Sequence, residues 1–145
     1  MNYGELLSSF LIDLQRLFRA DICFKDTTYS QILAIISIPA DGIEMSELAW
    51  VLGLDNSTVT RLIIRLEKKS WVKRKQSQRD QRAVTVFLTN KGSTIQQDIE
   101  KKIDIMGDKI KLEIDEDQRE HNLEALSSFH WTLRKIFLSS YYNTG

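Results

Sequence analysis

The change of residue pattern between Met45 and Asn90 constrains the fold of this chain more than any other feature. Apolar residues recur at helical spacing up to about Lys69, alternate as in a strand after Trp71, and return to helical spacing after Thr89. We therefore expect two short helices, a two-stranded hairpin and the start of another helix. Because the chain has only six glycines and one proline, we expect long helices on either side.

The flanking segments carry helical patterns of their own. Residues 6–19 form an apolar stripe at steps of three and four, and a second helix is expected over 29–37. The stretch 20–28 between them is polar and predicts a turn. After the hairpin we expect a long helix capped by Thr89, and a last helix opened by the acidic run 115–117.

Four residues satisfy the requirements of a helix-turn-helix. Ala49 is the small residue where two helices touch, Gly53 suits a left-handed turn, and Val59 and Leu62 are apolar on the inner side of the second helix. Ser46 is the expected N-cap of the first helix. A generic helix hairpin in an all-α core is the alternative interpretation.

The second of these helices is expected to begin at one of residues 55–57 and to bury Val59, Leu62, Ile63 and Leu66. Its opposite face then presents six candidate DNA-binding residues: Asn56, Ser57, Thr58, Thr60, Arg61 and Arg65. Short hydroxyls can approach base edges or phosphates, and arginine can bridge guanine with two hydrogen bonds. For each residue, base recognition, phosphate contact and simple solvation remain open.

The charge distribution supports this interpretation although the chain as a whole is neutral. Between Arg61 and Arg82, nine basic residues face two acidic ones, a net charge of +7. Between Asp98 and Glu124, ten acidic residues face five basic ones, a net charge of −5. A basic centre beside an acidic flank is typical of a protein that binds DNA with one face. A solvated helix face is the alternative.

The hairpin supplies a second set of candidates for DNA binding: Lys73, Lys75, Arg79, Asp80 and Arg82. An extended arginine fits the narrow minor groove, where the negative potential is strong. A phosphate would repel Asp80, so its carboxylate is expected to orient an arginine or to cap the turn. The alternative is an ordinary solvated hairpin.

The residues from Ser46 to Gly92 resemble the MarR family of winged-helix transcriptional regulators. The strongest marks are LDNSTVTRLIIRLE at 54–67, the pair Asp80-x-Arg82, and LTNKG at 88–92. Members often have glycine where this chain has Ser70, and a left-handed conformation there would cost serine roughly 1 kcal/mol.

The resemblance implies a mainly α fold with a small β-hairpin wing. Residues 28–89 would form a winged helix-turn-helix, and residues 1–27 and 90–145 a helical dimerisation region. It further implies a homodimer, which we expect to be a repressor, on a pseudo-palindromic operator in double-stranded DNA, with Arg82 in the minor groove. Surplus apolar residues agree with a dimer: Phe10, Phe129, Phe137, Tyr141 and Tyr142.

Members of this family commonly release DNA when they bind a small aromatic ligand or are oxidised. Candidate pocket residues for such an effector are Phe10, Phe18, Tyr29 and Trp50, although aromatic residues at helical spacing are also typical of a core. The hydroperoxide-responsive branch has its reactive cysteine in the first helix, near the position of Phe10. Cys23 lies beyond that helix, and Asp21 and Asp26 are expected to raise its pKa, which predicts a bystander thiol.

Other functions find no support in the sequence. The two histidines, His121 and His130, are nine residues apart and face different sides of a helix, so no metal site is expected. No catalytic arrangement, cofactor motif, secretory signal or membrane span is recognisable, and a single cysteine suits the cytoplasm. The alternatives left open are a redox- or metal-responsive regulator and a winged-helix protein-interaction module that does not bind DNA.

Overall fold

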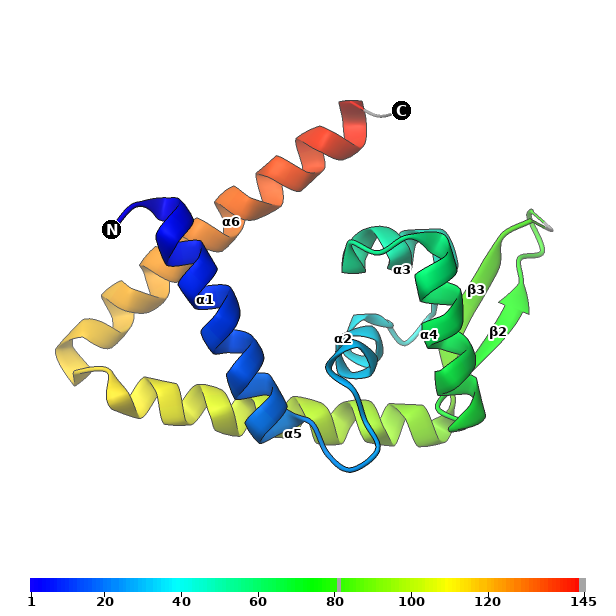
Figure 1. Cartoon of the computed structure of the whole chain (residues 1–145), viewed down its shortest axis with the longest axis horizontal. Helices are drawn as coiled ribbons and strands as arrows, with labels where there is room; N and C mark the ends of the chain where they lie inside the picture. Colours follow the sequence, from blue (N-terminus) through cyan, green and yellow to red (C-terminus); the bar gives the residue numbers. More distant parts are fainter. Residues whose placement is uncertain (81, 144–145) are drawn as a thin grey trace. The chain divides into compact units, whose positions relative to one another are not determined.

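The computed structural model describes residues 1–80 and 82–143, with side chains described to Ser139. The side chains of Tyr141 and Tyr142, predicted to lie on an apolar surface, fall outside the described residues. The chain divides into two compact units, residues 1–104 and residues from Ile105 onward, with the boundary inside one long helix. Figure 1 labels the elements in chain order. They are α1 (Tyr3–Leu17), η1 (Phe18–Ile22), α2 (Tyr29–Ser37), β1 (Ile43–Glu44), α3 (Met45–Leu52), α4 (Asn56–Lys68), β2 (Val72–Gln76), β3 (Val84–Leu88), α5 (Asn90–Glu113), η2 (Glu116–Gln118) and α6 (Arg119–Asn143).

The first helix begins earlier than predicted and continues into a π-helical turn. Asn2 and Glu5 form a capping box at the start of α1. The prediction of a turn over 20–28 is wrong for residues 20–22, which belong to the π-helix η1. Ile22 is fully buried there, so the interior holds the backbone in a conformation that the polar neighbouring residues do not indicate.

The core of the first unit lies between α2, α3, α4, β3 and the first half of α5. Its largest fully buried side chains are Ile22, Ile32, Ile35, Ile38, Leu48, Val59, Ile63, Leu66, Val86 and Ile99. The four residues predicted to form the inner face of α4 are all buried. Because each such side chain contributes about 1.5–3 kcal/mol on burial, this face holds α4 firmly to the core.

The start of α3 differs from the prediction. Ser46 is not the N-cap, because α3 begins at Met45 and Glu44 occupies the cap without a side-chain hydrogen bond. The reason is a short strand that the sequence did not reveal: β1 pairs with β3, with Ile43 opposite Val86. The chain therefore passes directly from the strand into the helix. Gly53 ends α3 with a left-handed φ of 66°, as predicted.

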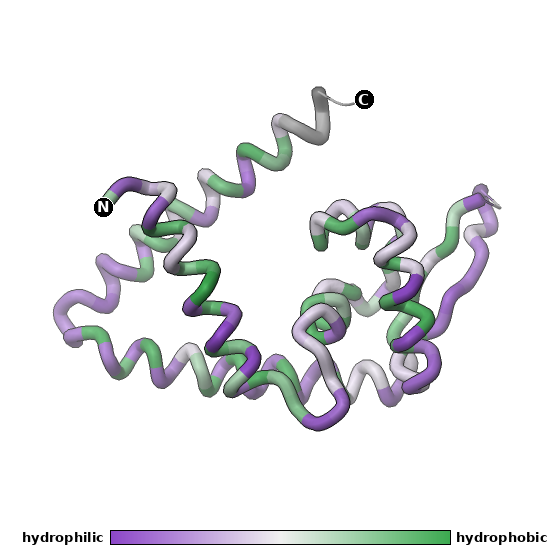
Figure 2. Tube along the Cα trace, viewed as in Figure 1, coloured by the Kyte–Doolittle hydropathy of each residue, from purple (hydrophilic) through white to green (hydrophobic). Residues whose placement is uncertain are grey.

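The wing is a three-stranded antiparallel sheet in the order β1-β3-β2, in which Arg74 lies opposite Val86. Figure 2 shows β2 as hydrophilic over most of its length, whereas β3 carries hydrophobic residues. The chain leaves β3 through Thr89, whose Oγ1 accepts a hydrogen bond from the Gly92 N–H at 3.0 Å and caps α5 as predicted.

Gly92 lies directly against the backbone at the start of the wing. A Cβ placed on this residue would be 1.9 Å from the carbonyl oxygen of Trp71, far closer than two atoms can approach. Thr89 N–H donates to the same carbonyl at 3.0 Å. The glycine of the LTNKG motif is therefore required by the packing of α5 against the root of the wing.

The second unit contains the end of α5 and the whole of α6. The acidic run 115–117 forms the cap and first residues of a short 3₁₀ turn, and α6 follows it. Several large apolar side chains are exposed, among them Leu123, Leu126 and Trp131. A cavity of about 460 Å³ lies between α5 and α6, with Ile110 and Leu126 in its lining. Within the described residues, no helix is both long and apolar enough to cross a membrane.

Candidate nucleic-acid interface

The N-terminal turn of α4 is held by its N-cap, Asp55. The carboxylate Oδ1 accepts hydrogen bonds from the Thr58 N–H at 2.7 Å and from the Ser57 hydroxyl at 2.8 Å. Chiefly the Thr58 N–H, and then the hydroxyls of Thr58 and Ser57, lower the pKa of Asp55 to about 2. The cap is therefore ionised at neutral pH and fixes the first turn of the helix.

The other polar residues predicted on this helix lie on its outer side. Thr60 Oγ1 donates to the Asn56 carbonyl at 2.8 Å, and Arg61 Nη2 donates to Thr58 Oγ1 at 3.4 Å. Asn56, Ser57, Arg61 and Arg65 are exposed, while Thr58 and Thr60 are half-buried. The three hydroxyl groups thus make local contacts within the helix, which leaves the amide and the two guanidinium groups as the longest donors on this face.

The five residues predicted in the wing are all exposed: Lys73, Lys75, Arg79, Asp80 and Arg82. Asp80 caps the turn, because its Oδ1 accepts from the Arg82 N–H at 2.9 Å and its carbonyl accepts from the Ala83 N–H at 3.0 Å. This confirms one of the two roles predicted for Asp80. The cap leaves the Arg82 side chain available, since it uses only the backbone of that residue.

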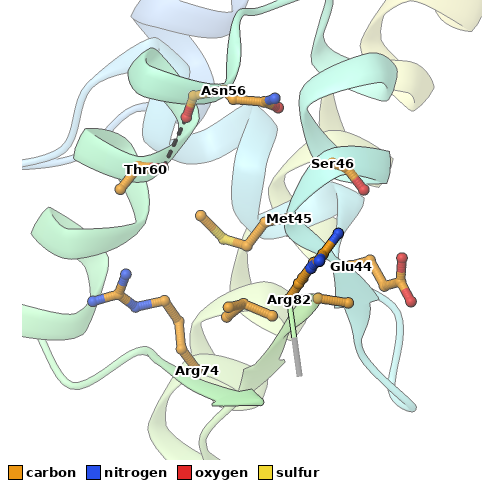
Figure 3. A pocket seen from close by; sticks show the side chains of 9 residues that line it. Glu44, Met45, Ser46, Asn56, Thr60, Arg74 and Arg82 are labelled. Atoms are coloured by element: carbon orange, nitrogen blue, oxygen red, sulfur yellow. Dashed lines mark hydrogen bonds between the residues drawn. The ribbon is translucent and has the colours of Figure 1, made fainter. Parts of the chain in front are cut away.

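A hollow of about 260 Å³ separates α4 from the wing (Figure 3). It brings together three predicted residues, Asn56, Thr60 and Arg82. Figure 3 shows Arg82 reaching toward Glu44 and Ser46. The sequence analysis did not include the other lining residues: Glu44, Met45, Ser46, Arg74, Ala83 and Val84. Arg74 had a signal, because it alternates with Lys73 and Lys75 along β2 and so faces α4.

Two of the nine basic residues between Arg61 and Arg82 make contacts inside the protein. Arg74 Nε lies 2.8 Å from Glu67 Oε1, and both side chains are about one-third exposed. Lys69 donates to the Asp26 carbonyl and to Gln31 Oε1. The other seven are exposed on α4 and the wing: Arg61, Arg65, Lys68, Lys73, Lys75, Arg79 and Arg82.

The candidate effector residues come together only in part. The rings of Phe18 and Tyr29 meet edge to face with centroids 6.3 Å apart, and the Arg19 guanidinium lies 5.4 Å from the Tyr29 centroid. Phe10 and Trp50 are 41% and 46% exposed. The structure therefore supports a contact between two of the four aromatic residues.

Cys23 follows η1 and is half-buried. Burial raises the pKa of its thiol, while Arg19 and Lys102 act in the opposite direction. The predicted direction is confirmed, but burial causes it rather than the neighbouring carboxylates. A thiol with a raised pKa is a poor nucleophile at neutral pH. In the described part of the chain, no group of three or more histidine, cysteine or acidic residues is placed to hold a metal ion.

Comparison with known proteins identifies relatives that share this arrangement. Residues 30–84 match the model of the MarR family. The chain is 35% identical over 78 residues to the HTH-type transcriptional regulator TtmR of Methylorubrum extorquens, a match covering 53% of this chain and 40% of that protein. It is 31% identical over 107 residues to the organic hydroperoxide resistance transcriptional regulator of Bacillus subtilis, covering 73% of this chain and 69% of the relative.

Solved structures show the same architecture. A cysteine-to-serine mutant of MarR from Escherichia coli, in complex with operator DNA, superposes with a TM-score of 0.71 at 25% identity, covering 92% of this chain and 91% of the other. The likeness extends over nearly the whole chain and confirms the predicted fold class, a mainly α protein with a winged helix-turn-helix.

Proposed function

Because the chain belongs to the MarR family of winged-helix transcriptional regulators, we propose that it binds a specific site in double-stranded DNA through α4 and the wing. The observation that carries the proposal is the set of seven exposed basic residues shared by these two elements. Two neighbouring basic residues are engaged within the protein, so the exposed set is selective and not a uniform coat of charge. As a member of a family of regulators, the protein is not an enzyme.

In this proposal α4 enters the major groove. Arg61 and Arg65, with Asn56, are the donors long enough to reach base edges, and Ser57, Thr58 and Thr60 approach the backbone near the helix N-terminus. Arg82 enters the minor groove, while Lys73, Lys75 and Arg79 contact phosphates. The operator complex of the structurally similar E. coli MarR supports this mode of binding.

We further propose that the protein acts as a homodimer, with residues 1–27 and 90–145 forming the dimerisation region around the winged domain, 28–89. Large apolar side chains are exposed throughout both parts, including Leu11, Ile12, Leu112 and Trp131. Two copies would place their α4 helices about 34 Å apart, one turn of DNA, on a pseudo-palindromic operator. A dimer covering such a site would act as a repressor in the cytoplasm.

The proposal includes release from DNA by a small aromatic effector. The adjacent rings of Phe18 and Tyr29, with Arg19 beside them, are the candidate contacts in the first unit. An anionic aromatic molecule would suit this combination of ring edges and a guanidinium group. The raised pKa of Cys23 gives no corresponding support to release by oxidation.

Titration of DNA at several salt concentrations tests the proposed function. The probe is a duplex recovered by the wild-type protein from a random library, with a scrambled duplex as the control. Each phosphate contact contributes about −0.9 to the slope of log affinity against log salt, so several contacts predict a steep slope. We expect tight, salt-sensitive binding that prefers the selected duplex. Weak binding without salt dependence would instead indicate a protein-interaction module.

A further inference from the structure

Lys69, the C-cap of α4, is attached to the loop that precedes α2. Its Nζ donates to the Asp26 carbonyl and, at 3.0 Å, to Gln31 Oε1. The same Nζ lies 4.6 Å from the centroid of the Trp71 ring. A lysine ammonium has three N–H donors, and here two carry hydrogen bonds while an aromatic ring covers the group. Although Lys69 belongs to the basic segment by sequence, its charge is used within the protein.

The backbone on both sides of this contact is unusual. In the described part of the chain, the non-glycine residues with positive φ are Asp26, at 64°, and Ser70, at 63°. Lys69 binds the carbonyl of the first and immediately precedes the second. Left-handed backbone is unfavourable for residues with a Cβ and persists only where the surroundings hold it. Lys69 therefore joins the two places where the backbone of this unit is most constrained.

The contact continues to α5 through two aromatic rings. Trp71 is 6% exposed, and its ring lies 6.0 Å from that of Phe24, tilted by 43°. Lys102 Nζ, from α5, lies 4.7 Å from the centroid of Phe24. We refer to Lys69, Trp71, Phe24 and Lys102 as the cation–aromatic column. It begins at the end of α4, passes the first residues of the wing, crosses the loop before α2 and ends on α5.

Neighbouring hydrogen bonds fix the same junction. The Ser70 carbonyl accepts from Thr89 Oγ1 at 2.6 Å, immediately before α5. Gln96 of α5 donates to the carbonyls of Ile35 and Ile38, at 2.9 and 2.8 Å, near the end of α2. The end of the recognition helix, the root of the wing and the first half of α5 are thus held together, with a lysine at each end of the column.

We propose that Lys69 and Lys102 are positioning residues for DNA binding. By closing the two ends of the column, they fix the direction in which α4 and the wing project from α5. This inference rests on the proposed function, in which α4 meets DNA and α5 belongs to the dimerisation region. In a dimer, the column then sets the separation of the two recognition helices and restricts binding to operators with one half-site spacing.

The competing explanation is that Lys69 contacts a phosphate directly. The two roles differ in two measurable quantities. Removal of a phosphate contact reduces the salt slope by about one and weakens binding to all duplexes alike. Removal of a positioning contact leaves the number of phosphate contacts unchanged, and it affects the dependence of affinity on half-site spacing.

The test compares two matched pairs of variants, K69Q with K68Q and K102Q with K101Q. In each pair the control removes the same charge from the adjacent exposed residue of the same helix segment. The probes are a duplex selected from a random library by the wild-type protein, and two derivatives with one central base pair inserted or removed. Affinity is measured over a series of salt concentrations, and thermal unfolding is recorded for every variant.

We expect K69Q and K102Q to bind the selected duplex about tenfold more weakly, within the range of coupling effects for residues outside a binding site. Their salt slopes should equal that of the wild type, and their discrimination between the three spacings should be reduced. K68Q and K101Q should retain the wild-type discrimination. K69R should recover most of the affinity, because arginine keeps a cation beside the Trp71 ring.

A salt slope reduced by about one in K69Q, with spacing discrimination intact, would identify a phosphate contact and overturn the inference. Wild-type affinity and discrimination in both K69Q and K102Q would overturn it as well. If K69Q does not fold, K102Q decides between the same outcomes from the far end of the column. A wild-type protein that selects no duplex would overturn the proposed function itself, which separates the two failures.

Discussion

At the scale of single residues, the structure separates basic side chains that a count of charges treats as equal. Arg74 and Lys69 lie in the same basic segment as Arg82, yet Glu67 holds one and the loop before α2 holds the other. The sequence could predict a basic surface because the charges are local to one segment. It could not predict which charges are engaged, because their partners are distant in the chain or on a different element.

Arg82 gives the sharpest prediction at this scale. Arg82→Ala should weaken operator binding by about 1–3 kcal/mol, the range of a groove contact, without altering the fold. The fold should persist because Asp80 caps the turn through the backbone N–H of residue 82, which alanine retains. Fluorescence anisotropy titration measures the loss. Arg79→Ala is the matched control from the same turn, and equal losses in the two variants would contradict a special role for Arg82.

At the scale of secondary-structure elements, the helices with local signals were predictable. The predicted bounds of α2, residues 29–37, agree with the structure, as does the left-handed end of α3 at Gly53. The start of α3 was not predictable, since it depends on the pairing of β1 with β3, far along the chain. Ile22 is a similar case, because only its burial by other elements accounts for η1.

The cap of α4 gives a prediction for stability against pH. The pKa of Asp55 in the folded protein is lowered from 3.8 to about 2, so the folded state favours the ionised form. The contribution of this cap is therefore fully present above about pH 4 and is lost as the pH falls from about 4 toward 2. Asp55→Asn is the matched variant, because asparagine caps a helix but does not titrate. The melting temperature of the wild type should exceed that of Asp55→Asn at neutral pH, and the difference should shrink below pH 4. A difference that is constant down to pH 2 would show that the ionised cap does not contribute.

At the scale of the whole molecule, the exposed apolar residues determine what the chain does in solution. Leu126 and Trp131 of α6 are 47% and 58% exposed, and α1 has no buried residue. The apolar spacing of these helices could be predicted from sequence. What covers them could not, because an apolar stripe has the same pattern whether it faces its own chain or another copy.

Sedimentation tests this scale. The wild-type protein should sediment as a dimer at micromolar concentration, and Leu126→Glu should shift it toward monomer, since a buried carboxylate would lack a partner. Val51→Glu, at an exposed apolar position of α3 outside the proposed dimerisation region, should leave the dimer intact. A wild-type monomer would refute the dimer, and an equal shift in both variants would place the interface elsewhere.

The contact of Gly92 with Trp71 also bears on how such a protein can evolve. The smallest possible replacement, glycine by alanine, adds one carbon at a point 1.9 Å from the Trp71 carbonyl oxygen. Every other amino acid brings that same carbon, so no gradual series of substitutions leads away from glycine at this position. Divergence of the binding surface can proceed through α4 and the tip of the hairpin, where side chains point outward. The root from which both project can change only if the paths of β2 and α5 change together.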